Sequence, residues 1–345
     1  MYLKDIHIPN VKVETYEKEE RQRLQKNFGY SFEDLKRIIP MANNGMEATK
    51  AMGKDTPLAV LSDRTHPLFN YFKQLFAQVT NPPIDAIREE IVTSTSVYIG
   101  KDGNILEEKP ENCKVLKIHN PILTNTDILK LKNINVPGFK TAVVPIVYYK
   151  GISLEKAIDQ VFVDVDKAHK DGANIIILSD RGVDEYHVQI PSLLAVSAVH
   201  QYLVKTKKRT TLSLVLESGE PRAVHHFATL LGYGASAVNP YLAHDTIKQM
   251  VEEEMINKDP YAAIDDYNEG SQIFEAIGIS KDVIDKYFTG TVSRVEGITL
   301  KDIENSVETL HSKAFDPLGL DVDLTLESSG DHKLRSGKEE HKYNP

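Results

Sequence analysis

The chain has 345 residues, enough for one large domain or two ordinary ones, and its 41% hydrophobic and 26% charged residues are typical of a soluble globular protein. A formal net charge of −9 at pH 7 offers no electrostatic footprint for a nucleic-acid backbone, so no nucleic-acid partner is expected. The longest apolar run, residues 142–149, is too short to span a membrane, and the first residues lack the apolar core of a signal peptide.

Residues 1–40 are predicted to form a charged N-terminal arm that ends in a short helix. Ser31 and Asp34 have the spacing of a capping box, and Pro40 is expected to stop the helix because proline lacks a backbone N–H. Residues 41–57 are rich in Gly and Asn and indicate a loop.

Two further helices are expected before the regular part of the chain. Residues 65–79 place apolar side chains at three- and four-residue steps, which is the pattern of an amphipathic helix. Residues 84–98 predict a short helix that passes into a strand.

From residue 141 onward, apolar runs alternate with helical patterns, which predicts an α/β fold with parallel strands in βα repeats. We expect a partial barrel-like arrangement with a helical and loop-rich N-terminal part, because no Gly-rich dinucleotide-binding turn follows the first strand. The predicted strands are 142–148, 174–179, 211–216 and 236–239, and the helices between them are 153–170, 191–205 and 221–234.

Polar residues follow three of the predicted strands, and the carboxyl ends of parallel strands are where α/β proteins hold their ligands. The groups are Asp180, Arg181, Glu217 and Asn239. They are candidates for holding a small polar ligand, and the alternative is that they cap helices and close turns, with Asp180 and Arg181 as a structural pair.

Other candidates for chemistry favour structural roles. His225 and His226 are adjacent on a predicted helix and point about 100° apart, so they are unsuited to sharing one metal. Ser192 lacks the elbow of a serine hydrolase, and glycines 232 and 234 suit a helix end better than a phosphate cradle. The single cysteine, Cys113, forms no intrachain disulfide and ligates no cluster alone, which favours a reducing, cytoplasmic location.

The most unusual stretch is a rigid, polar turn after a strongly apolar segment. It contains Thr80, Asn81, Pro82 and Pro83, and two consecutive prolines hold the chain extended. Such a segment loses little entropy on docking, so it suits a surface that faces another domain. The alternative is an exposed loop at a helix stop.

Several strings resemble the central domain of the glutamate synthase large chain, across nearly the whole chain from about residue 28. The most specific is YFKQLFAQVTNPPID at residues 71–85. The others include PLAVLS (57–62), LSDRGV (178–183), PSLLAV (191–196), HHFA (225–228), AVNPYL (237–242) and QIFEAIG (272–278).

The resemblance implies an enzyme that makes two glutamates from glutamine and 2-oxoglutarate. In such an enzyme, an amidotransferase domain frees ammonia, which passes through a tunnel to an FMN-bearing synthase domain with a 3Fe-4S cluster. The resemblance implies that the central domain links the two, has a barrel-like α/β fold without a cofactor, and helps to wall the tunnel. Partners would be those two domains and an electron-donating subunit or a ferredoxin.

These implications divide the chain into an arm (1–40), a central α/β domain (41–312) and a linker (313–345) toward an FMN synthase domain that this chain lacks. Met1 is not the cysteine nucleophile expected of an amidotransferase domain, and one cysteine is too few for a three-iron cluster. We therefore expect no catalytic, cofactor-binding or metal-binding residues in this chain. Thr80 to Pro83 are the expected tunnel or interdomain residues.

The chain departs from the family at residues 268–271, where a Lys- and Gly-rich stretch is shortened by some twenty residues. This puts contacts to the flavin domain in doubt. Two alternative functions stay open: a barrel-like enzyme or binding domain that holds a phosphate-bearing ligand such as FMN at its strand ends, and a docking module that acts only with separate partner chains.

Overall fold

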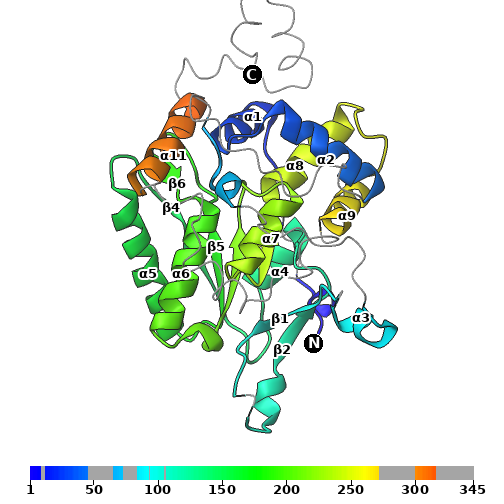
Figure 1. Cartoon of the computed structure of the whole chain (residues 1–345), viewed down its shortest axis with the longest axis vertical. Coiled ribbons are helices and arrows are strands. Elements are labelled where there is room, and N and C mark those ends of the chain that lie inside the picture. The colour runs from blue at the N-terminus through cyan, green and yellow to red at the C-terminus, as the bar shows by residue number, and fades with distance from the viewer. Residues whose placement is uncertain are drawn as a thin grey trace, which may run out of the picture.

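The computed structural model describes residues 1–8, 12–45, 65–72, 84–92, 94–104, 106–271 and 300–315. Its centre is an α/β unit in which four parallel strands lie side by side in the order β3, β5, β7, β8. Strand β5 is labelled near the middle of Figure 1. Among the described residues these strands form an open sheet, so the predicted partial barrel-like α/β fold is confirmed. The strands are β3 (Thr141–Pro145), β5 (Ile175–Ser179), β7 (Ser213–Glu217) and β8 (Ala237–Asn239).

Strand β5 is buried on both faces of the sheet, as its unbroken apolar run predicts. Ile176 and Leu178 belong to the larger core, on the side of three helices that follow the strands. Ile175 and Ile177 belong to a second core on the opposite side, with α4 and the β1–β2 hairpin. The helices are α5 (Leu154–Lys170), α6 (Ser192–Lys205), α7 (Val224–Gly232) and α4 (Asn125–Lys132), and the hairpin strands are β1 (Val97–Gly100) and β2 (Val115–Ile118).

A second group of helices lies across one end of this unit, at the top of Figure 1. Helix α1 packs against α8 and α11, and α2 packs against α9. Leu24 of α1 and Phe28 just after it are members of the larger core. Part of the N-terminal segment is therefore packed onto the α/β unit, while the proposed boundary after residue 40 stays a prediction. The group consists of α1 (Lys18–Asn27), α2 (Phe32–Asn44), α8 (Tyr241–Glu252), α9 (Pro260–Gly270) and α11 (Leu300–Phe315).

Helix α2 begins as predicted but does not end at Pro40. Ser31 Oγ accepts from the Asp34 backbone N–H, and the Asp34 carboxylate accepts from the Ser31 N–H, which completes the capping box. The helix continues through Pro40 to Asn44 and ends at Gly45 in the left-handed conformation. Met41 is fully buried in the larger core, and packing of α2 against α9 outweighs the hydrogen bond that the proline omits.

The predicted strand 142–148 is two strands in two sheets. Ile146 leaves the parallel sheet after its N–H donates to Ser179 O, and its carbonyl accepts from Ile190 N. The chain then forms β4 (Val147–Tyr149), which pairs antiparallel with β6 (His187–Gln189). The apolar pattern is continuous across this break, so periodicity alone does not reveal it.

Three smaller expectations also needed correction. The described part of 65–79 holds a 3-10 helix, Leu68–Tyr71, and not an α-helix. Helix α7 begins at Val224, three residues after Pro221, and β7 begins at Ser213 because a 3-10 turn, Arg209–Thr211, precedes it. The short helix and strand expected within 84–98 are confirmed as α3 (Ala86–Val92) and β1.

Helix α5 spans the predicted range, but the Ser153 side chain makes no capping bond. The first N–H of the helix, from Leu154, donates instead to Glu304 Oε2 of α11 at 3.2 Å. None of the helices in the described ranges has the length and apolar content needed to cross a bilayer.

Candidate functional site at the strand ends

The register of the sheet brings the predicted strand-end groups side by side. Ser179 pairs with Glu217, and Glu217 pairs with Asn239, at the last positions of β5, β7 and β8. Asp180 follows Ser179 directly, and its N–H donates to Glu217 O at 3.1 Å. The residues that the sequence singled out thus lie together, whereas their role in ligand binding stays a prediction.

Glu217 is the buried acceptor at the centre of this group. Ser179 Oγ donates to it at 2.6 Å, Arg181 Nε at 2.7 Å, and Lys132 Nζ, at the end of α4, at 2.9 Å. Burial opposes ionisation, but the attraction of Arg181 and the hydrogen bonds from Lys132 and Ser179 outweigh it and hold the pKa of Glu217 below its ordinary value. The carboxylate therefore joins β5, β7 and α4.

Arg181 extends from Glu217 toward the N-terminal segment. Its Nη1 donates to Tyr16 OH at 2.8 Å and to Glu14 Oε2 at 3.0 Å, and its guanidinium lies 4.0 Å from the centre of the Tyr241 ring. Burial would lower the pKa of Arg181, but the neighbouring Tyr16 and Glu217 raise it. Arg181 thus stays charged, and its ion pair runs to Glu217 and Glu14 and not to Asp180.

Asp180 turns away from Arg181 toward the loop after β7. Ser218 Oγ donates to it at 2.5 Å and Gly219 N at 3.1 Å. Burial is the main cause that raises the pKa of Asp180 to about 7, although these donors and Tyr241 act in the opposite direction. The predicted structural pair of Asp180 with Arg181 does not form.

The ends of β7 and β8 are closed by the chain itself. The Phe28 ring packs directly against Gly219, and Tyr30 OH donates to Gly219 O at 3.0 Å. Asn239 is fully buried, and its Nδ2 donates to Leu123 O and to Asn125 Oδ1, both at 2.9 Å. Asn239 therefore has a structural position at this end of the sheet.

Sequence reasoning missed Arg222, which is buried beside this end of the sheet. Its Nη1 donates to Phe28 O and Glu220 O, and its Nη2 donates to Gly29 O and Asp34 Oδ2. The sequence does show an arginine directly after the polar turn that follows β7. Its partner Phe28 lies nearly 200 residues away in the chain, so the sequence did not reveal the contact.

A cavity of about 740 Å³ borders the ends of β3 and β5, on the side away from the closed ends of β7 and β8. The sheet contributes Val143, Pro145 and Ser179, the loop after β5 contributes Arg181 and Gly182, and α4 contributes Lys132. The wall opposite is residues 12, 14–16 and 20 of the N-terminal segment.

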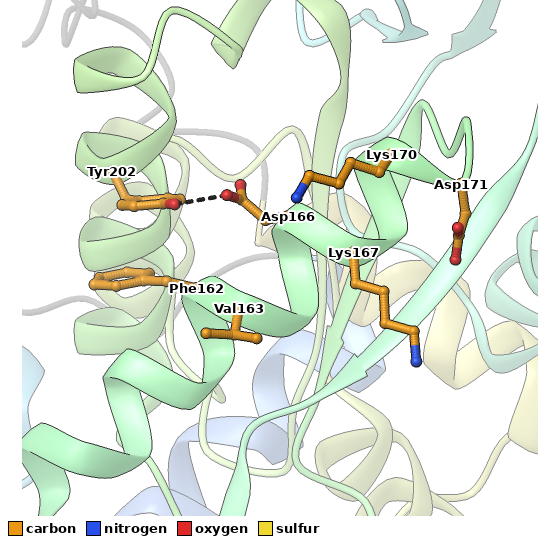
Figure 2. Close-up of a pocket in the computed structure, with 7 residues that line it drawn as sticks. All are labelled: Phe162, Val163, Asp166, Lys167, Lys170, Asp171 and Tyr202. Atoms are coloured by element: carbon orange, nitrogen blue, oxygen red, sulfur yellow. Dashed lines mark hydrogen bonds between the residues drawn. The ribbon is translucent and has the colours of Figure 1, made fainter.

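A smaller groove of about 390 Å³ lies on the outer surface between α5 and α6 (Figure 2). The Phe162 and Tyr202 rings are stacked at 4.4 Å, and Tyr202 OH donates to Asp166 Oδ2 at 2.8 Å. Lys208 Nζ is 2.7 Å from the other Asp166 oxygen. Asp166 is therefore paired with Tyr202 and Lys208, and the lining also includes Lys167, Lys170 and Asp171.

The remaining sequence candidates lie in structural settings. Ser192 donates through Oγ to Glu220 Oε2 at 2.5 Å, and His226 stacks on Phe69 at 4.3 Å. Gly234 has a φ of +117° and lies directly against the His200 ring, which agrees with a helix end. Within the described ranges, no group of three or more His, Cys, Asp or Glu is placed to hold a metal ion. Cys113 is exposed, and Thr80, Asn81, Pro82 and Pro83 lie outside the described residues.

A sequence profile of the glutamate synthase central domain matches residues 23–269. This chain belongs to that family. Among curated relatives, it is 43% identical to the glutamate synthase (NADPH) large chain of Bacillus subtilis and 36% identical to the ferredoxin-dependent glutamate synthase 2 of Synechocystis sp.. Each alignment covers 93% of this chain, but only 22% and 23% of the relatives.

This chain thus spans about a fifth of the length of these relatives. Among solved structures, a flavocytochrome b2 mutant with benzoylformate aligns over 44% of this chain and 32% of its own, with 17% identity and a TM-score of 0.25. A likeness this weak carries no argument about function.

Proposed function

We propose that this chain is the connecting domain of a glutamate synthase large chain and has no catalytic activity of its own. In this role it links an amidotransferase domain to an FMN synthase domain, which together convert glutamine and 2-oxoglutarate into two glutamates. The FMN and the 3Fe-4S cluster belong to the synthase domain. Family membership and the small share of the relatives' length that the chain spans support this proposal.

The observation that carries the non-catalytic role is the closure of the sheet at β7 and β8. In a parallel α/β protein, ligands bind at the carboxyl ends of the strands. Here the Phe28 ring covers Gly219, and Asp180 and Glu217 are bonded to groups of the same chain. A phosphate-bearing ligand at these two strand ends would have to displace Phe28 and approach two carboxyl groups.

An exposed apolar surface on α3 supports the linking role. Ile87 and Ile91 lie one helical turn apart and are 87% and 78% exposed. A seven-residue helix has little stability of its own in water, so an apolar pair on its outer face suits docking against another part of a larger chain. α3 follows shortly after Thr80 to Pro83, the proposed tunnel or interdomain residues.

We further propose that Thr80 and its neighbours help to wall an ammonia tunnel. A path without bulk water admits ammonia and disfavours ammonium, because a charge in a low-dielectric environment is costly. In a full-length enzyme, replacing Thr80 by Phe should reduce glutamate formation for each glutamine hydrolysed. An unchanged amount of glutamate formed for each glutamine hydrolysed would contradict the placement of Thr80 in the tunnel wall.

The first experiment uses the 345-residue chain by itself. Glutaminase activity is measured by ammonia release, and FMN binding is measured by quenching of flavin fluorescence. We expect neither. Tight FMN binding would favour the alternative of a barrel-like domain with a phosphate-bearing ligand, and glutaminase turnover would contradict the connecting role outright.

The second experiment tests the α3 surface in a full-length large chain. Ile87→Asp and Ile91→Asp should lower the ratio of glutamate formed to glutamine hydrolysed, because a carboxylate opposes docking of an apolar surface. The matched control is Val163→Asp on α5, where the side chain is 60% exposed. The same ratio of glutamate formed to glutamine hydrolysed in all variants would show that α3 is not part of the domain junction.

Partners of the whole enzyme are proposed on the same basis. An electron-donating subunit or a ferredoxin would reach the synthase domain and not this chain. Mixing the chain with separately produced amidotransferase and synthase domains, followed by size measurement, tests the remaining alternative of a docking module. Assembly from separate pieces would favour that alternative over a covalent connecting domain.

A further inference from the structure

The cavity beside β3 and β5 is built around one face of Arg181. The inner edge of the guanidinium is fixed, since Nε donates to the buried Glu217 and the plane stacks on Tyr241. The side chain of Arg181 is only 14% exposed. Its Nη1, which lies on the other edge, meets Glu14 and Tyr16 of the N-terminal segment that lines the cavity.

Tyr16 supplies a second donor at the same place. Burial raises the pKa of Tyr16 to about 12, although Arg181 acts in the opposite direction, so the hydroxyl stays protonated at neutral pH. Its oxygen accepts from Arg181, which leaves its proton for donation to an anion. The Tyr16 carbonyl accepts from Arg21 Nη2 at 2.9 Å, and Arg21 is held by Asp245, so Tyr16 is anchored from both ends.

Glu14 is held far less firmly than Tyr16. Its side chain is 72% exposed, and its carboxylate pairs with Arg181 Nη1 at 3.0 Å. Exposed ion pairs contribute little stability and weaken with salt, so this carboxylate is readily replaced. Lys12, Lys132 and Glu20 line the same cavity, and Lys132 is already paired with the buried carboxylate of Glu217.

We propose that this cavity is a binding site for a small carboxylate, with Arg181 and Tyr16 as the hydrogen-bond donors. The ligand takes the place of the Glu14 carboxylate, which pairs with Arg181 in this structure. We infer a carboxylate as the ligand because the group that pairs with Arg181 in this structure is the carboxylate of Glu14. The site lies beside the closed ends of β7 and β8, shares the ion pair of Arg181 with Glu217, and does not depend on the connecting role.

The test is isothermal titration of the 345-residue chain with glutarate at low ionic strength. Glu14→Gln keeps the size of the side chain but removes the competing charge, so it should tighten glutarate binding about two- to fivefold. Tyr16→Phe should weaken binding, and Arg181→Gln should abolish it. Lys170→Gln, in the groove between α5 and α6, is the matched control and should leave the affinity unchanged (Figure 2).

Three results would overturn the proposal. They are no heat of binding in either the native chain or Glu14→Gln, equal affinity in Arg181→Gln, and binding of inorganic phosphate in preference to glutarate. Circular dichroism checks that each variant is folded. If Arg181→Gln does not fold, opposite shifts in Glu14→Gln and Tyr16→Phe still support the site, and the absence of both shifts contradicts it.

Discussion

Arg222 shows at the scale of one residue how a buried cation holds separate segments together. It is 3% exposed, donates to three backbone carbonyls and to Asp34, and lies over the Tyr30 ring. Burial opposes charge on Asp34, but Arg222 and the donors of Ser31 outweigh it and bring the pKa of Asp34 to about 2. The capping box of α2 and the turn after β7 are therefore linked through one side chain.

Replacing Arg222 by Ala should lower the free energy of unfolding by about 3–5 kcal/mol, because it leaves buried acceptors and the partly buried carboxylate of Asp34 without their partner. Urea denaturation followed by circular dichroism measures the change. The control is Lys208→Ala, which removes a partly exposed pair with Asp166 and should cost about 1 kcal/mol or less. Similar losses in both variants would contradict this difference in burial.

Asp180 should give the unfolding free energy a distinct pH dependence. Its folded pKa of about 7 lies above the value of about 4 expected in an unfolded chain. Between these values the folded state holds a proton that the unfolded state has lost, so the contribution of Asp180 to stability is fully present below about pH 4 and is lost as pH rises through 7. Asp180→Asn should remove this contribution, and a variant-minus-native difference that does not change with pH would contradict it.

At the scale of elements, α11 depends on one buried histidine. His311 is fully buried, and its Nε2 lies 2.6 Å from Asp184 O and 3.1 Å from His187 O. Both acceptors are carbonyls, so Nε2 carries the proton. The contact ties α11 to the loop before β6, while α11 also packs on α1 and α5.

Acid should loosen α11 more than α5. Burial is the main cause that lowers the pKa of His311, so below about pH 6.5 the unfolded segment binds a proton that the folded one does not. The contribution of His311 to stability is thus fully present above that pH and is lost as pH falls. Hydrogen exchange within α11, compared with α5, measures the effect, and His311→Gln should reduce it. Equal acid dependence in that variant would rule out His311 as the cause.

At the scale of the whole molecule, the sheet is shared by two cores. Ile177 and Leu178 are neighbours on β5, both fully buried, and they face opposite sides. Because each side has its own set of packed side chains, neither face of β5 is available to solvent. The strand therefore couples the two cores, as does β7, where Leu214 and Leu216 belong to one core and Val215 to the other.

Ile177→Ala and Leu178→Ala should each lower the free energy of unfolding by about 2–5 kcal/mol, since each leaves a cavity in a different core. The control, Val163→Ala on the exposed face of α5, should change it by about 0.5 kcal/mol or less. Thermal and urea unfolding give these values. If only one of the two β5 variants loses little free energy of unfolding, the core that contains the replaced side chain is loosely packed.

The sequence by itself determined the order of the βα units, the α/β class and the capping box of α2, because these depend on neighbouring residues and on apolar periodicity. It also predicted that Asp180, Glu217 and Asn239 lie together, since parallel strands end at one edge. The end of α2, the break at Ile146 and the partners of Arg181 and Arg222 were decided by the tertiary structure. Those partners lie 165 and 194 residues away, at Tyr16 and Phe28, and local patterns carry no information about contacts over such distances.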